Sequence, residues 1–146
     1  MKTRIKVLDK EFEIKSRLKE EGVNFPISND NLQHNKFTIS ISRIIDNKRI
    51  TRRFYFYDSF NNYRKGITDL DEDTLKWVFR HILEDGLLGC YTFSEFCKEL
   101  GLNEDSITAL RSHQACQKTL IKLLGLGILL GELTDIINEL SKMGIE

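Results

Sequence analysis

The chain has 146 residues, of which 40% are hydrophobic and 30% are charged, with one proline and three cysteines. This length and composition predict a folded chain that buries a core without disulfides or metal, and they argue against disorder. An odd number of cysteines is typical of a reducing compartment. Residues 1–8 alternate charged and apolar side chains, unlike a signal peptide, and the apolar stretch 120–133 is too interrupted to span a bilayer. We therefore expect a cytoplasmic protein with no membrane contact.

The net charge of zero conceals a division between the two parts of the chain. Residues 1–66 contain fifteen Lys and Arg against eight Asp and Glu, whereas residues 67–146 contain seven against fourteen. Such an asymmetry fits a surface that faces a polyanion or a charged partner. It also fits two faces that are simply solvated, and the hydrophobic periodicity does not decide between these alternatives.

The first third of the chain has a weak strand pattern followed by a loop. Residues 5–14 predict a short hairpin with its turn at Asp9-Lys10. A helix over residues 10–21 competes with it, because this segment is rich in Lys and Glu. Clustered Asn, Ser and Asp around a proline predict a loop over residues 24–35.

The strongest β pattern covers residues 36–57. Apolar and small polar side chains alternate over residues 37–42, and the aromatic-rich stretch 49–57 returns as a second strand. A turn at Asn47-Lys48 would place Arg43 opposite Arg52. Two like charges side by side are unfavourable unless an anion or an acidic partner lies between them.

The pattern becomes helical after residue 66. Residues 71–89 predict a first helix with acidic residues in its first turn, ended by glycines. Thr92 and Glu95 form a capping box for a short helix over residues 93–100, which Gly101 stops.

Two further helices are expected. Asn103 or Asp105 caps a helix that runs to about Leu124. Its expected apolar face consists of Ile107, Leu110, Ala115, Leu120 and Leu123. After three interrupting glycines, a last helix carries the apolar stripe Leu133, Ile136, Ile137, Leu140 and Met143. This stripe either completes the core, which is the favoured alternative, or forms the seam of a homodimer.

Strands that precede helices predict an α+β fold rather than a wound parallel sheet. We expect an N-terminal antiparallel β-sheet, containing the hairpin 36–57, packed against a C-terminal group of three to four helices. The chain would form a single domain over residues 1–146, mainly β in residues 1–66 and mainly α in residues 67–146.

The residues that carry chemistry do not form a catalytic motif. Asp69, Asp71 and Asp73 have the spacing that opens a calcium loop, but this loop lacks the required glycine and the closing glutamate, so acidic residues at a helix N-terminus are the better account. His34, near the basic hairpin, is the only candidate for a general base, and no other histidine pairs with it in sequence. The Cys and His residues Cys90, Cys97, His113, Cys116 and His81 match no zinc spacing. We therefore expect no enzyme activity, no metal and no cofactor.

A cluster of basic and aromatic residues on the hairpin is the most specific functional signal. A two-stranded ribbon can enter a nucleic-acid groove, and exposed tyrosines can stack on bases. The same cluster would also fit an acidic protein partner, or it is a solvated face that protects the sheet edge. The candidate partner- or nucleic-acid-binding residues are Arg43, Lys48, Arg49, Arg52, Arg53, Tyr55 and Tyr57.

Several stretches resemble small uncharacterised accessory proteins of phages and prophages. The stretches are residues 54–66, 93–106, 114–118 and 123–125, which together cover less than half of the chain. The similar proteins usually end soon after the last of these stretches, so the helix after Gly127 departs from them. Such accessory proteins include anti-CRISPR proteins and other anti-defence inhibitors, which commonly act by stoichiometric binding.

The resemblance implies an inhibitor that binds a host defence protein or ribonucleoprotein complex through either its basic hairpin or its acidic helical surface. The alternative is a small nucleic-acid-binding regulator that uses the basic hairpin, and a third reading is a sponge that traps a nucleotide signal between two protomers. In the acidic variant, carboxylates imitate phosphates; the residues are Asp69, Asp71, Glu72, Asp73, Glu104 and Asp105.

Overall fold

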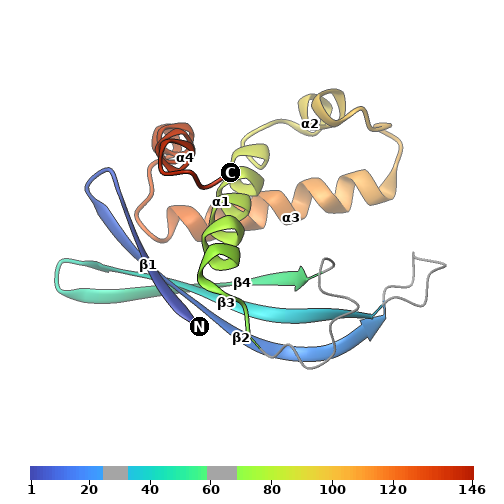
Figure 1. The fold of residues 1–146 in the computed structure, drawn as a ribbon. Helices are drawn as coiled ribbons and strands as arrows, with labels where there is room; N and C mark the ends of the chain where they lie inside the picture. The colour runs from blue at the N-terminus through green and yellow to red at the C-terminus, as the bar shows by residue number, and fades with distance from the viewer. Residues whose placement is uncertain (25–32, 59–68) are drawn as a thin grey trace. The chain divides into compact units, whose positions relative to one another are not determined.

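The computed structural model describes residues 1–24, 33–58 and 69–146. It contains a four-stranded antiparallel sheet followed by four helices, so the expected α+β class is confirmed (Figure 1). The elements are β1 (Lys2–Val7), β2 (Lys10–Asn24), β3 (Gln33–Ile45), β4 (Lys48–Asp58), α1 (Glu72–Leu88), α2 (Phe93–Leu100), α3 (Ile107–Leu124), a single 3₁₀ turn η1 (Leu130–Glu132) and α4 (Leu133–Lys142).

The chain forms two compact units whose boundary falls inside α1. Unit 1 contains residues 1–6 and 10–78, and unit 2 contains residues 7–9 and 79–146. The sheet and the first half of α1 therefore belong to unit 1, whereas the other helices belong to unit 2. The expectation of one domain over residues 1–146 stays a prediction.

The strands follow one another in the order β1-β2-β3-β4, so each strand pairs with its neighbour in sequence. The turn between β3 and β4 is Asp46-Asn47, with φ values of 51° and 64°. Two successive positive φ values are typical of the type I′ turn that suits the twist of a hairpin. The predicted turn at Asn47-Lys48 is therefore wrong, and the register differs by two residues. Arg43 lies opposite Ile50 and Arg52 opposite Ile41, so the two arginines do not face each other.

Residues 10–21 are a strand and not a helix, because they belong to β2. Their alternation decides this: buried Phe12, Ile14 and Ser16 point to one face, while charged residues point to the other. The turn before β2 is Leu8-Asp9, one residue earlier than expected. The predicted loop over residues 24–35 is too long, since Asn24 and residues 33–35 lie in strands; residues 25–32 lie outside the described residues.

One face of the sheet forms the core of unit 1. Ile14, Ile39 and Ile41 are fully buried on this face. The first half of α1 adds buried Leu75, and the ring of Trp77 meets Phe56 of β4 edge to face, with 6.0 Å between the ring centroids. Such an arrangement is favourable for two aromatic rings.

Close contacts between α1 and α3 depend on glycine in unit 2. A Cβ atom at Gly86 would collide with the side chain of Leu123, and a Cβ atom at Gly89 would collide with the backbone carbonyl of Cys116. Gly86 lies within α1 rather than ending it, in contrast to the sequence expectation. The absence of a side chain at these two positions therefore lets the two helices approach closely.

The caps of α2 agree with the sequence, whereas the cap of α3 does not. Thr92 and Glu95 form the expected capping box, and Gly101 ends α2 with a φ of 67°. The N-cap of α3 is Ser106, whose hydroxyl accepts a hydrogen bond from the amide of Ala109 at 3.2 Å. The predicted caps Asn103 and Asp105 are therefore wrong.

The C-terminal helix is part of the core of unit 2. Four residues of the predicted stripe, Leu133, Ile136, Ile137 and Leu140, are buried, so the favoured alternative holds for them, whereas the fifth, Met143, is exposed. Arg80 of α1 also fixes the end of α4, because its guanidinium donates to the carbonyl oxygens of Ile137 at 3.2 Å and Ile145 at 3.0 Å. A cation at a helix C-terminus is favourable because the free carbonyls there carry partial negative charge.

Candidate polyanion-binding face

The second face of the sheet, which we call the outer face, carries the charged residues of the strands. Residues alternate between the two faces along each strand, and residues paired across strands share a face. The burial of Thr3, Ile5 and Val7 on the core face therefore places the even-numbered residues of β1 on the outer face. In β2 the burial of Phe12, Ile14 and Ser16 places the odd-numbered residues on the outer face, where Glu13 meets Arg4 of β1. The pairings of β2 with β3 and of β3 with β4 extend this assignment to the other two strands.

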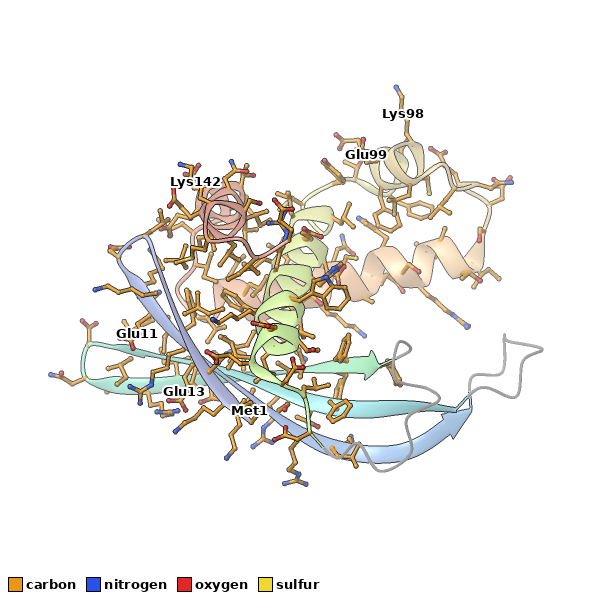
Figure 2. The ribbon with its side chains drawn as sticks, viewed as in Figure 1. Met1, Glu11, Glu13, Lys98, Glu99 and Lys142 are labelled. Carbon is orange, nitrogen blue, oxygen red and sulfur yellow. The ribbon has the colours of Figure 1, made fainter. Side chains whose placement is uncertain are left out.

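The outer face is strongly basic in the part of the chain that the structure describes. All but one of its cations are exposed, the exception being half-buried Lys36. Its nine basic residues, drawn from all four strands, are Lys2, Arg4, Lys6, Lys15, Arg17, Lys19, Lys36, Arg49 and Arg53. The acidic side chains described on this face are Glu11 and Glu13 of β2, both labelled in Figure 2.

Small side chains of β3 form the middle of the outer face. Ser40 pairs with Lys15 of β2 on one side and with Arg53 of β4 on the other. Neighbouring strands are about 4.8 Å apart, so the backbones of β2 and β4, which carry these two cations, are about 10 Å apart. The hydroxyl of Ser40 lies between them. This row therefore offers two cations and one hydrogen-bonding hydroxyl to an anionic chain that lies along β3.

Glu13 is the acidic residue held most tightly on this face. Its carboxylate lies 2.5 Å from the guanidinium of Arg49 and 3.6 Å from that of Arg4. Burial raises the pKa of Glu13, but the hydrogen bond and charge of Arg49, together with the charges of Lys2 and Arg4, outweigh it and lower the pKa overall. The carboxylate is therefore ionised at neutral pH and fixes the guanidinium of Arg49.

Two tyrosines lie beside the cations on β4. Tyr55 is 52% exposed and Tyr57 is 39% exposed. The ammonium groups of Lys19 and Lys36 lie 4.7 and 4.9 Å from the ring centroid of Tyr55, and Lys36 lies 5.5 Å from that of Tyr57. These cation–π contacts keep the tyrosine rings on the outer face among the lysines.

The structure divides the residues that the sequence predicted for binding. Arg49, Arg53, Tyr55 and Tyr57 lie together on the outer face. The alternation places Lys48, Arg43 and Arg52 on the other face of the sheet, where the guanidinium of Arg43 lies 5.7 Å from the ring centroid of Phe12. The basic surface is therefore not the hairpin alone.

Seven of the cations were missed by the sequence reasoning, all of them on β1, β2 and the start of β3. The signal that could have found them is the alternation of charged and apolar residues over residues 2–7 and 10–19. Treating residues 10–21 as an undecided strand or helix hid this alternation, because a helix would scatter the same charges around its axis.

Four of the six acidic residues proposed as phosphate mimics accept hydrogen bonds within the protein, and three of these four lie near the start of α1. Asp69 accepts hydrogen bonds from the amino group of Met1 and from the hydroxyl of Ser16 at 2.8 Å, and Glu72 accepts one from Thr3 at 2.9 Å. Asp71 caps α1 by accepting from the amide of Thr74 at 2.7 Å. In unit 2, Glu104 accepts from the hydroxyl of Ser94 at 2.6 Å. These contacts explain much of the acidic charge without a partner.

His113 and two of the cysteines, Cys97 and Cys116, are packed in unit 2, whereas Cys90 is exposed. His113 is buried against the ring of Phe96, with 5.0 Å between the ring centroids, and its Nε2–H donates to the carbonyl of Tyr91 at 2.7 Å. Burial raises the pKa of Cys116 to about 11, and it also raises the pKa of Cys90 and Cys97. Thiols in this state are poor nucleophiles and poor metal ligands. Across the described ranges, no group of three or more His, Cys, Asp and Glu side chains is placed to hold a metal ion. His34 lies in β3, and its side chain is not among the described ones.

Comparisons with known proteins give no relative for this chain. No family model, no curated protein and no solved structure matches it. Within residues 1–24, 33–58 and 69–146, no helix is long and apolar enough to cross a membrane. The resemblance to phage accessory proteins therefore stays a prediction.

Proposed function

We propose that this protein acts by binding, and that the outer face of its sheet binds a polyanion, with single-stranded nucleic acid as the favoured ligand. The observation that carries the proposal is the gathering of nine cations and two tyrosines from four strands on one face. Clustered Lys and Arg release counterions when they neutralise phosphates, and this release drives the binding of nucleic acids.

The shape of the face favours a single strand over a duplex. A duplex presents grooves that admit a helix or a two-stranded ribbon, whereas a broad sheet face accepts a splayed strand whose bases stack on aromatic side chains. Thr38 pairs with Arg17 and with Tyr55, so this cross-strand row combines a phosphate-binding cation, a hydroxyl and a stacking ring. Bases would compete with Lys19 and Lys36 for the ring of Tyr55.

Fluorescence anisotropy with labelled single-stranded and duplex oligonucleotides over a range of salt concentrations tests this proposal. The variant Lys15→Gln with Arg53→Gln removes two cations from the row through Ser40. For a single strand we expect a loss of affinity of about tenfold or more and a decrease of roughly 0.7 in the slope of log K against log salt for each lost phosphate contact.

The matched control is Lys98→Gln with Lys142→Gln, which removes the same charge from exposed positions on α2 and α4 (both residues are labelled in Figure 2). We expect this control to bind as the unaltered protein does. An equal loss in both double variants would show only a general charge effect, and it would overturn the assignment to the outer face.

Tyr55 provides a separate test of the single-strand preference. Tyr55→Ala is expected to weaken single-strand binding by about 1–3 kcal/mol without changing the salt slope, because stacking does not release counterions. Tyr55→Phe retains the ring and should bind nearly as well as the unaltered protein. If Tyr55→Ala binds as well as Tyr55→Phe does, stacking plays no part and the ligand is read through its phosphates alone.

A host defence ribonucleoprotein complex is the second candidate target, supported by the resemblance to phage inhibitors and by the same basic face. Such a complex presents both acidic protein surface and RNA, and positive potential would steer the encounter with either. Retention of a purified defence complex by the immobilised protein, together with no binding to free oligonucleotides, would favour this inhibitor over the nucleic-acid regulator. Strong binding to free single strands without retention of the complex would exclude it.

A further inference from the structure

Helix α3 carries two different apolar stripes, and only one of them is used within unit 2. The inner stripe packs against other elements of the unit: Ala109 and His113 are buried with α2, and Leu123 lies against Gly86 of α1. The second stripe, which we call the α3 seam, is turned by about 110° around the helix axis at 100° per residue. It consists of Ile107, Leu110, Gln114, Gln117, Ile121 and Leu124.

The α3 seam is exposed although its ends are strongly apolar. Ile107 is 67% exposed, Leu110 40%, Ile121 68% and Leu124 41%. Single exposed apolar residues are normal, but a row of four along one helix face marks an interaction surface in a soluble protein. Ile107 and Leu110 belong to the apolar face that the sequence predicts for this helix, yet both side chains are exposed.

The spacing of the α3 seam specifies what kind of surface covers it. Successive members are three, four, three, four and three residues apart, as in the a and d positions of a heptad repeat. This spacing forms a narrow straight stripe that fits another α-helix by knobs-into-holes packing. The seam extends over the whole of α3, which is about 27 Å long at 1.5 Å per residue.

The seam presents the same kinds of side chain in the same order whether it is followed from its N-terminal or its C-terminal end. It begins with two aliphatic residues, continues with Gln114 and Gln117, and ends with two aliphatic residues. A two-fold axis at its midpoint therefore places Ile107 against Leu124, and Leu110 against Ile121, of a second copy. The same axis places Gln114 against Gln117, so that two amides can hydrogen-bond to each other instead of facing an apolar surface.

The charges at the ends of α3 also favour the antiparallel arrangement that this two-fold axis produces. Glu104 and Asp105 precede the helix, and Lys122 lies in its last turn. An antiparallel pair brings the acidic start of each helix beside the basic end of the other, which is favourable for the side chains and for the helix dipoles. Arg111 and Lys118 approach each other at the solvent border of the pair, where water and salt screen their repulsion.

We propose that α3 forms an antiparallel two-helix contact with α3 of a second copy of this chain, through the α3 seam. A hydrophobic seam bordered by like charges is not weakened by salt, so the dimer should persist at high ionic strength. The two central glutamines fix the register at some loss of affinity, as buried polar residues do in coiled coils.

Sedimentation equilibrium and light scattering on the full chain test the proposal. We expect a concentration-dependent dimer, and we expect Leu110→Gln with Ile121→Gln to give a monomer, because these changes make the seam polar without altering charge or lowering helix propensity. The control Leu129→Gln changes a leucine that is also 67% exposed but lies outside the seam, and it should leave the dimer intact. Circular dichroism and thermal unfolding should show that both variants are folded.

A second variant tests whether the dimer becomes stronger when the seam is made more apolar. Gln114→Leu with Gln117→Leu completes the apolar stripe and should tighten the dimer by at least about tenfold. A monomer in both this variant and the unaltered protein, at all accessible concentrations, would overturn the proposal.

Disulfide trapping tests the antiparallel direction in a chain whose exposed Cys90 is changed to Ser. Leu110→Cys should cross-link to Ile121→Cys when the two variants are mixed, whereas Ile121→Cys alone should not cross-link to itself. Efficient self-trapping of Ile121→Cys would show a parallel pair and overturn the antiparallel arrangement.

Discussion

At the residue scale, the packing of unit 2 depends on a missing side chain. Gly89→Ala should lower the free energy of unfolding by about 1–3 kcal/mol, because the new methyl group meets the rigid backbone carbonyl of Cys116 and the two helices must separate. Chemical denaturation measures the change. The control is Gly131→Ala, where a Cβ atom meets nothing within 4 Å. A similar loss in both variants would show that helix approach is not the cause.

The carboxylates at the start of α1 predict how stability depends on pH. The hydrogen bond from Thr3 and the charge of Lys76 lower the pKa of Glu72. Partial burial raises the pKa of Asp69, but hydrogen bonds from the Met1 amino group and from Ser16 outweigh it and lower this pKa as well. A lowered pKa in the folded state stabilises the protein above the unfolded pKa of about 4, and this stabilisation is lost as the pH falls through the folded value.

We therefore expect the unfolding midpoint in denaturant to fall as the pH decreases below about 4. The variant Asp69→Asn with Glu72→Gln should be less stable at neutral pH and should lose less of its stability on acidification. Asp73→Asn, an exposed acid in the same helical turn, is the control and should keep the original pH profile. A double variant whose pH profile matches that of the control would contradict this account.

At the element scale, the first hairpin contains a residue poorly suited to its turn. Leu8 has a φ of 56°, in the left-handed region that disfavours a side chain such as leucine. Leu8→Asn should raise the free energy of unfolding by about 0.5–1 kcal/mol, because asparagine tolerates this conformation better. Leu102→Asn is the matched control, since Leu102 is 41% exposed, against 45% for Leu8, and is not among the residues with positive φ, so it should bring no gain.

The strands show how far sequence periodicity leads. Alternation identified β3 and β4, but the predicted register was wrong by two residues, and the predicted binding cluster combined residues of both faces. A shift of two keeps every side chain on its own face, so the hydrophobic pattern cannot detect it. The register is decided by the turn, where Asp46 and Asn47 both accept positive φ values. The supposed contact of Arg43 with Arg52 depended on that register, and it is absent for the same reason.

Helix α3 shows a second limit of periodicity. Its sequence contains an inner stripe and an exposed stripe. If the helix is assumed to have one apolar face, residues of both stripes are assigned to that face. The predicted face combined Ile107 and Leu110 from the α3 seam with Leu123 from the inner stripe. Only the packing of Cys116 and Leu123 against Gly89 and Gly86 shows which stripe faces α1. The basic outer face was hidden in a similar way, because it requires knowledge of all four strands.

At the scale of the whole molecule, the two proposals together predict bivalent binding. A dimer through the α3 seam carries two outer faces, so a long single strand that reaches both should bind at least about tenfold more tightly than a short one. Leu110→Gln with Ile121→Gln should remove this advantage while leaving the affinity for a short oligonucleotide unchanged. Anisotropy measurements with short and long homopolymers check this. If the monomeric variant still binds a long strand more tightly than a short one by the same factor, dimerisation is not the cause of the tighter binding.

The sequential order of the strands also bears on how the chain folds. Every pairing in the sheet joins neighbours in sequence, and two of the three connections are two-residue turns. Contacts of this kind have low contact order, since little loop entropy is lost before they form. During synthesis the four strands also leave the ribosome before α2, α3 and α4. We therefore expect the sheet to form early and quickly during folding.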